Sequence, residues 1–164
     1  MFVFVRAVTY STWFIGFVLV FLPARVLSSS GVVAPPAIGP WQRVGMLVAA
    51  IGAALAIWCI VTFALVGKGT PAPFDPPRRL VLQGPYRFVR NPMYIGAGLA
   101  MAGAAIFYQS VALFAYIAMF FLVTHVFVAA YEEPTLRRTF GKDYKAYCDT
   151  VGRWWPRFRG SSIP

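Results

Sequence analysis

Two groups of polar residues stand at the two ends of one long apolar stretch. The first group is residues 90–94, with the sequence RNPMY, and the second is the glutamate pair at 132–133. From Asn91 to Tyr131 there is no Asp, Glu, Lys or Arg, and His125 is the one histidine of the chain. The stretch is long enough to cross a bilayer twice, because one crossing takes about 20 apolar residues. A chain that crosses and returns brings both groups to one membrane face, where they can hold a polar cofactor beside an apolar substrate.

The composition indicates an integral membrane protein. Hydrophobic residues make up 59% of the 164 residues and charged residues 12%, whereas soluble domains carry about 25% charged residues. The net charge of +10 lies mostly in two segments that flank apolar runs. This distribution fits contact with anionic lipid headgroups and the bias of basic residues towards the cytoplasm. It argues against nucleic acid as the partner.

Four apolar segments predict an all-α integral membrane protein with about four transmembrane helices. Arg6 before the first segment also fits a signal peptide, but no small-residue cleavage site follows at once, so we expect a retained span. Residues 108–110 form a polar break suited to a tight helical hairpin between the last two segments. The four segments are residues 7–23, 44–66, 92–107 and 111–131.

Basic residues predict the orientation in the membrane. The loop 67–91 carries five basic residues against Asp75, and the tail after Tyr131 carries seven, whereas the turn between the last two spans carries none. We therefore expect both termini and the cofactor site to be cytoplasmic. We expect one structural domain, in which a two-span region over 1–66 precedes a cofactor-binding core over 67–164.

An amphipathic helix with a basic face is expected after the glutamates, lying in the membrane interface. Trp154-Trp155, flanked by Arg153 and Arg157, is typical of an interfacial anchor. The apolar residues of this helix recur three or four positions apart and are Leu136, Phe140, Tyr144 and Tyr147.

Asn91-Pro92 predicts the start of a helix at the membrane surface. Asn is a favoured N-cap residue and Pro is favoured at the first helical position. The free N–H groups of that first turn can face a ligand. Arg87 and Arg90 either bind a carboxylate or phosphate or are ordinary cytoplasmic basic residues. Tyr86 and Tyr94 either stack on a ligand ring or are interfacial aromatics.

Adjacent carboxylates at the membrane end of a helix repel each other and lose hydration unless another group compensates. For Glu132 and Glu133, that group is a ribose diol, an ammonium, or the arginines upstream; alternatively the two form a solvated helix end paired with Arg137. His125 lies seven residues before Glu132, so both share a helix face. An ionisable residue within a span is a functional candidate, although a lone histidine also bonds to neighbouring helices.

Small residues predict close packing between helices. They recur every four residues at Gly52 and Ala56, and again at Gly96, Ala100 and Ala104. No His, Cys or carboxylate cluster has the spacing of a metal site, and no glycine-rich nucleotide-binding fingerprint occurs. We therefore expect no metal.

The stretch 84–96, with the sequence GPYRFVRNPMYIG, resembles the signature of isoprenylcysteine carboxyl methyltransferases and phospholipid N-methyltransferases. In that family an Arg-His-Pro-x-Tyr pattern is followed later by Glu-Glu. The region from 132 to 157 also resembles the family's C-terminal part, so the likeness covers about residues 78–157. The departure is Asn91, where the family often has His. We interpret this position as one that caps the helix and offers backbone groups, a role Asn fills equally well.

The resemblance implies a membrane-embedded methyltransferase that uses S-adenosylmethionine and releases S-adenosylhomocysteine. The acceptor would be lipophilic, either an isoprenylcysteine-like carboxylate or a lipid amine, and membrane lipids would surround it. Direct displacement needs the acceptor held in line with the methyl group; an amine acceptor also needs deprotonation. The candidate catalytic residues are His125, Glu132 and Arg90. The candidate cofactor-binding residues are Tyr86, Arg87, Arg90, Asn91, Pro92, Tyr94, Glu132 and Glu133.

Two other classes of protein also fit the sequence. A nicotinamide-dependent membrane reductase of the steroid reductase type also has an Asn-Pro-x-Tyr element, but typically with an acidic residue just after the following glycine. Here Ala97 follows Gly96. The other alternative is a non-catalytic membrane protein that retains the fold.

Overall fold

A computed structural model describes residues 15–32, 37–67 and 79–157. Within these ranges the chain is helical and forms no strand; Val89 and Gly152 make one isolated parallel bridge. The helical elements are η1 (Ile15–Phe21), α2 (Leu22–Ser29), α3 (Pro40–Thr62), η2 (Phe63–Gly67), η3 (Gly84–Arg87), α4 (Pro92–Tyr108), α5 (Val111–Phe127), η4 (Val128–Glu132) and α6 (Glu133–Thr150).

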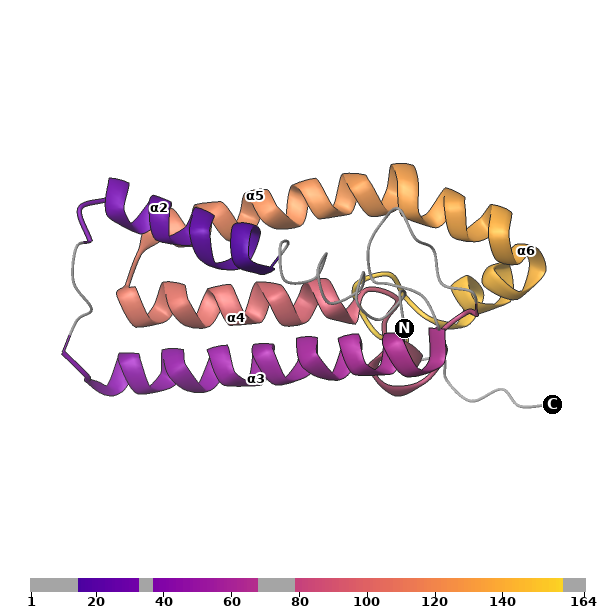
Figure 1. Cartoon of the computed structure of the whole chain (residues 1–164), viewed down its shortest axis with the longest axis horizontal. Helices are drawn as coiled ribbons and strands as arrows, with labels where there is room; N and C mark the ends of the chain where they lie inside the picture. Colours follow the sequence, from indigo (N-terminus) through magenta and orange to yellow (C-terminus); the bar gives the residue numbers. More distant parts are fainter. Residues whose placement is uncertain (1–14, 33–36, 68–78, 158–164) are drawn as a thin grey trace.

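The helices form an elongated bundle (Figure 1). α4 packs against both α3 and α5, and α2 lies against α5. The Tyr116 hydroxyl of α5 donates to the carbonyl of Val18 in η1 over 2.8 Å, which ties the N-terminal helix to the bundle. At one end α6 turns back towards the loop that precedes α4 (Figure 1). The predicted all-α class is confirmed for the described residues.

Glycines let α3 and α4 approach until their backbones touch. A Cβ on Gly52 would collide with the Ala100 nitrogen and lie 2.7 Å from the Gly96 carbonyl oxygen. A Cβ on Gly45 would lie 2.7 Å from the Gly103 oxygen. The predicted close packing is confirmed at Gly52 and Gly96, and the seam extends to a second glycine pair that the sequence analysis did not name.

Two helices are long and apolar enough to cross a bilayer, over Pro40–Gly67 and Val111–Thr150. Two shorter apolar helices, Gly16–Ser29 and Pro92–Tyr108, accompany them. The helix expected over 92–107 is confirmed almost to the residue. The first half of the segment expected over 7–23 lies outside the described residues, and its described part runs on to Ser29 rather than stopping at Pro23.

The predicted hairpin at 108–110 is confirmed. Gln109 has φ 50° and ψ 41°, a left-handed conformation that ends α4. The Ser110 hydroxyl then accepts a hydrogen bond from the Leu113 N–H over 3.3 Å and caps α5. A helix end in the left-handed region followed at once by an N-cap reverses the chain within two residues.

A helix follows the glutamates, as predicted, but no break separates it from α5. Helical backbone continues from α5 through η4 into α6, and the bend comes later, at Gly141 with φ 52° and ψ −117°. Beyond the bend, Tyr144, Tyr147 and Val151 are buried. They pack against partly buried apolar residues from before the bend and from the loop ahead of α4, among them Leu80, Leu136 and Phe140.

Candidate active site

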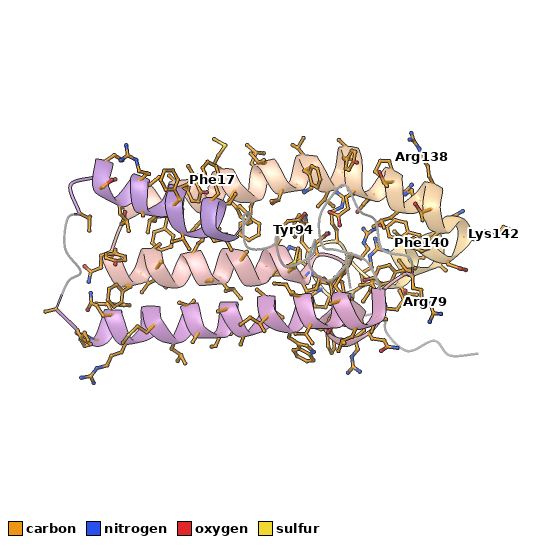
Figure 2. The ribbon with its side chains drawn as sticks, viewed as in Figure 1. Phe17, Arg79, Tyr94, Arg138, Phe140 and Lys142 are labelled. Carbon is orange, nitrogen blue, oxygen red and sulfur yellow. The ribbon has the colours of Figure 1, made fainter. Side chains whose placement is uncertain are left out.

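The α4–α5 hairpin brings the two polar groups of the sequence to the same end of the bundle. α4 begins at Pro92 and the α5–η4 helix reaches Glu132, so the antiparallel pair closes with these residues side by side. The Tyr94 hydroxyl donates to Glu132 Oε2 over 3.4 Å. Figure 2 shows Tyr94 between α4 and α5, at the end where α6 turns back.

Glu133 is the buried anion of this site, with 5% of its surface exposed. Arg153 donates two hydrogen bonds to it, from Nε to Oε1 over 2.7 Å and from Nη2 to Oε2 over 2.9 Å. Arg90 Nη1 lies 3.2 Å from Oε1. Burial by itself raises the pKa of the Glu133 carboxyl, but the Arg153 hydrogen bond and the charges of Arg90, Arg153 and Arg137 outweigh it, so the pKa lies below its ordinary value. Glu133 is therefore ionised at neutral pH.

Arg90 joins the start of α4 to the segment after α6. Its backbone N–H donates to the Gly152 carbonyl over 2.9 Å, and its Nη1 donates to Cys148 Sγ over 2.6 Å. Its side chain is 10% exposed. Among the described residues, its Nε is a buried donor without a hydrogen-bond partner. A buried unpaired donor is costly, so an acceptor that reached this N–H would be bound favourably.

Asn91 precedes the first residue of α4, as predicted, but its side chain does not cap the helix. Its Nδ2 instead donates to the Arg153 carbonyl over 3.2 Å. The physical reason is the segment after α6, which lies across this turn and presents a carbonyl to the amide. The position still starts the helix, while its side chain holds the C-terminal segment.

Glu132 differs from its neighbour because no arginine is bonded to it in the described part of the chain. It lies just beyond the apolar part of its helix. Burial raises the pKa of its carboxyl to about 7; the Tyr94 hydrogen bond opposes this and the charge of Glu133 adds to it. Glu132 therefore exchanges a proton near neutral pH, as a general acid or base must.

Aromatic rings surround Tyr94. The rings of Phe120 and Trp154 lie 6.5 Å and 6.4 Å from its ring. Trp154 also packs at 6.1 Å from Phe121, and its Nε1 donates to His125 Nδ1 over 3.0 Å. His125 is thus linked to the site indirectly, by its hydrogen bond with Trp154.

A cleft of about 440 Å³ opens beside Arg90. Apart from Arg90, its lining residues all come from the segment after α6: Gly152, Arg153, Trp154, Trp155, Pro156 and Arg157.

The comparison with family models decides the family. The model of phospholipid methyltransferases matches residues 41–143, more than half of the chain. The chain belongs to the phospholipid methyltransferase family. With its two apolar helices of spanning length, membership indicates a membrane protein with methyltransferase activity on lipids. No curated protein and no solved structure gives a significant match.

The phospholipid methyltransferase match contains both polar groups and His125, but it ends before the segment that lines the cleft. From the sequence, residues 153–157 are expected to form an interfacial anchor and to resemble the family's C-terminal part, but not to line a cleft. The sequence offers one indication of the ion pair: Arg153 stands twenty positions after Glu133. That separation has no helical or strand period, so only the fold reveals the ion pair.

Of the predicted site residues, all of which lie in the described part of the chain, Arg90 lines the cleft and the others do not. Tyr86 is buried beside Cys59 and Val81, and its carbonyl accepts from the Tyr147 hydroxyl over 2.6 Å. Pro92 is fully buried. Arg87 is exposed, with its guanidinium 4.6 Å from the centre of the Phe88 ring.

Proposed function

We propose that this protein transfers the methyl group of S-adenosylmethionine to a lipophilic acceptor at one end of a four-span membrane bundle. The observation that carries the proposal is the Tyr94–Glu132 pair packed beside Trp154, which lines a cleft together with Arg90, within a member of the phospholipid methyltransferase family. The basic residues of α6 and of the loop before α4 support a cytoplasmic position for this end and for both termini.

The side chains at the cleft fit the chemistry of S-adenosylmethionine. The side chains of Arg90, Arg153 and Arg157 suit a carboxylate, because guanidinium groups bind carboxylates with strong charge-assisted hydrogen bonds. The Arg90 Nε has no hydrogen-bond partner within the described part of the chain. The indoles of Trp154 and Trp155 suit a planar base. Glu132 suits a ribose hydroxyl or an ammonium group.

The remaining candidate residues support the side chains that line the cleft or lie near them. Glu133 and Asn91 hold Arg153 in place, and Pro92 and Tyr86 are buried nearby in the chain. Arg87 stands at the exposed edge. When bound, S-adenosylmethionine supplies an electrophilic methyl group. The protein then has to exclude water and hold the nucleophile in line with the methyl group. The hydrogen bonds that join the C-terminal segment to this end of the bundle favour both.

The environment of Glu132 favours a lipid amine as the acceptor. A carboxylate beside Tyr94 and Trp154 attracts an alkylammonium group, because aromatic faces and a carboxylate both favour cations. With a pKa of about 7, Glu132 can accept the proton that an ammonium must lose before its nitrogen attacks. An isoprenylcysteine-like carboxylate is the second candidate, because Arg90, Arg153 and Arg157 gather at the neighbouring cleft.

The test uses the full chain purified in detergent and returned to lipid nanodiscs. Calorimetry measures saturable binding of S-adenosylmethionine, and a radiolabelled methyl donor measures transfer to phosphatidylethanolamine and to a farnesylcysteine analogue. We expect binding, and transfer to the amine. Absence of binding to well-folded protein would refute the proposal, and binding with transfer only to the carboxylate would reverse the order of acceptors.

A further inference from the structure

The segment 151–157 is fastened across the end of the bundle at four points. The Arg90 N–H bonds to the Gly152 carbonyl, and Asn91 bonds to the Arg153 carbonyl. The Arg153 guanidinium bonds to Glu133. These three ties all lead to residues within or beside the proposed cofactor site. The fourth tie, from Trp154 to His125, leads instead to the last turn of the apolar helix α5.

Trp154 forms a wall of the site. It lines the cleft, and its ring lies 6.4 Å from Tyr94 and 6.1 Å from Phe121. Apolar contact alone leaves a planar ring free to slide and rotate, whereas a hydrogen bond from the indole N–H fixes its orientation. His125 supplies that bond over 3.0 Å, and the two rings stack with 28° between their planes.

The position of His125 does not suit direct proton transfer. A general base must reach within hydrogen-bond distance of the proton that it takes. His125 is exposed on α5, does not line the cleft, and uses Nδ1 as the acceptor for Trp154. Glu132 lies seven residues further along the chain, and within the described residues no hydrogen bond joins the two.

We infer that His125 is a positioning residue that fixes the indole of Trp154 as a wall of the cofactor and acceptor site. The role of this wall in binding cofactor and acceptor rests on the proposed function. The contact between His125 and Trp154 does not. His125 needs to offer only an acceptor at the position of Nδ1, and Asn can offer one there through Oδ1. A residue that shuttles protons could not be replaced in this way.

The experiment compares His125→Leu, which removes the acceptor, with His125→Asn, which keeps one. Trp154→Phe and the double variant His125→Leu/Trp154→Phe complete a cycle, and Val126→Ala on the same helix is the control. The first readout needs no ligand: acrylamide quenching of tryptophan fluorescence, with Trp154→Phe identifying the contribution of Trp154. We expect His125→Leu to increase the quenching of Trp154 and His125→Asn to restore it.

The second readout separates affinity from turnover. We expect His125→Leu to weaken S-adenosylmethionine binding about fivefold, the effect of one lost hydrogen bond, and to do so no further once Trp154 is Phe. His125→Asn should recover most of the affinity and of kcat. The inference is overturned if His125→Leu leaves the quenching unchanged, or if His125→Asn loses kcat while quenching and affinity stay normal. If the unaltered protein binds no S-adenosylmethionine, the proposed function fails, but the quenching still decides the inference.

Discussion

Glu132 and Glu133 are neighbours in the chain, yet the fold shifts their pKa values in opposite directions. Glu133 is held by two arginines and its pKa is lowered, whereas Glu132 meets Tyr94 and its pKa is raised to about 7. The difference arises because successive residues on a helix point about 100° apart. One carboxylate faces the segment after α6 and the other faces the hairpin. Sequence alone, which shows two identical residues, does not separate these roles.

Replacing Glu132 by Gln should strongly reduce methyl transfer and stabilise the protein. Transfer to an amine at pH 8 should fall roughly 100-fold or more, because the general base is lost. In the unaltered protein, activity should rise with pH through about 7, as Glu132 loses its proton. Radiolabelled methyl transfer from pH 5.5 to 8.5 measures both effects. If Glu132→Gln shows the same rise of activity with pH as the unaltered protein, Glu132 is not the group that causes the rise.

The stability of the same variant follows from the direction of the shift. The pKa of Glu132 is raised from 4.5 to about 7 in the folded protein, so the folded state binds the proton more tightly than the unfolded chain. Stability therefore falls as pH rises from about 4.5 to about 7. Glu132→Gln should be more stable than the unaltered protein at pH 8 by about 3 kcal/mol, with little difference at pH 4.5. Thermal melts at the two pH values provide the check.

Replacing Glu133 by Gln should destabilise the fold, since it leaves Arg90 and Arg153 without their buried partner. The expected loss is about 3 kcal/mol, measured by thermal or denaturant unfolding at pH 7. Because the folded-state pKa of Glu133 is lowered, its stabilisation is present above its unfolded value of 4.5 and is lost as pH falls through the folded value. The variant should lack that acid-sensitive component. Adding Arg153→Met to Glu133→Gln should recover part of the loss; an additive further loss would argue against the pair.

At the scale of elements, the α3–α4 seam depends on the absence of side chains. Gly52→Ala should destabilise the bundle by about 1–3 kcal/mol, because its Cβ would collide with the α4 backbone, which cannot move as a flexible side chain can. Ala53→Val is the matched control, since Ala53 is the exposed neighbour on the same helix. Thermal unfolding followed by size-exclusion chromatography measures both. Equal effects of the two changes would show that the seam is looser than described.

The return of α6 depends on one backbone conformation. Gly141 has φ 52°, which favours glycine, and a Cβ there would meet nothing within 4 Å. Gly141→Ala should therefore cost about 1 kcal/mol through backbone strain and not through collision. Limited proteolysis should show earlier cleavage after Lys142 and Lys145. Thr139→Ala, on the exposed face before the bend, should leave the digestion pattern unchanged.

The sequence predicted elements better than it predicted their contacts. Hydropathy located α4 and α5, and the polar break located the turn at Gln109, because both signals are local. The small-residue spacing found Gly52 and Gly96 because a helix repeats at about four residues. It did not find the bend at Gly141, where helical propensity continues on both sides. It also missed the pairs Glu133–Arg153 and His125–Trp154, whose partners meet only because α6 turns back.

For the whole molecule, the proposed topology places the site and α6 on the cytoplasmic side. A cysteine at Lys142, at the tip of α6 (Figure 2), should react with an impermeant maleimide only from that side. A cysteine at Gln109, in the turn at the other end of the α4–α5 hairpin, should react only from the opposite side. The background is Cys148→Ala, which removes the partly exposed native thiol, while Cys59 is buried. Inverted membrane vesicles and intact cells give the two directions, and the reverse pattern would overturn the orientation.

The fastening of residues 151–157 over the bundle end also sets an order of events during synthesis. α3, α4 and α5 leave the ribosome before Arg153, so the apolar helices can enter the bilayer and pair along their glycine seam while Glu133 still lacks its main partner. Arg153, Trp154 and the cleft that they line arrive later and dock onto helices that are already in place. We therefore expect the site to mature late in folding, in a step separable from membrane insertion.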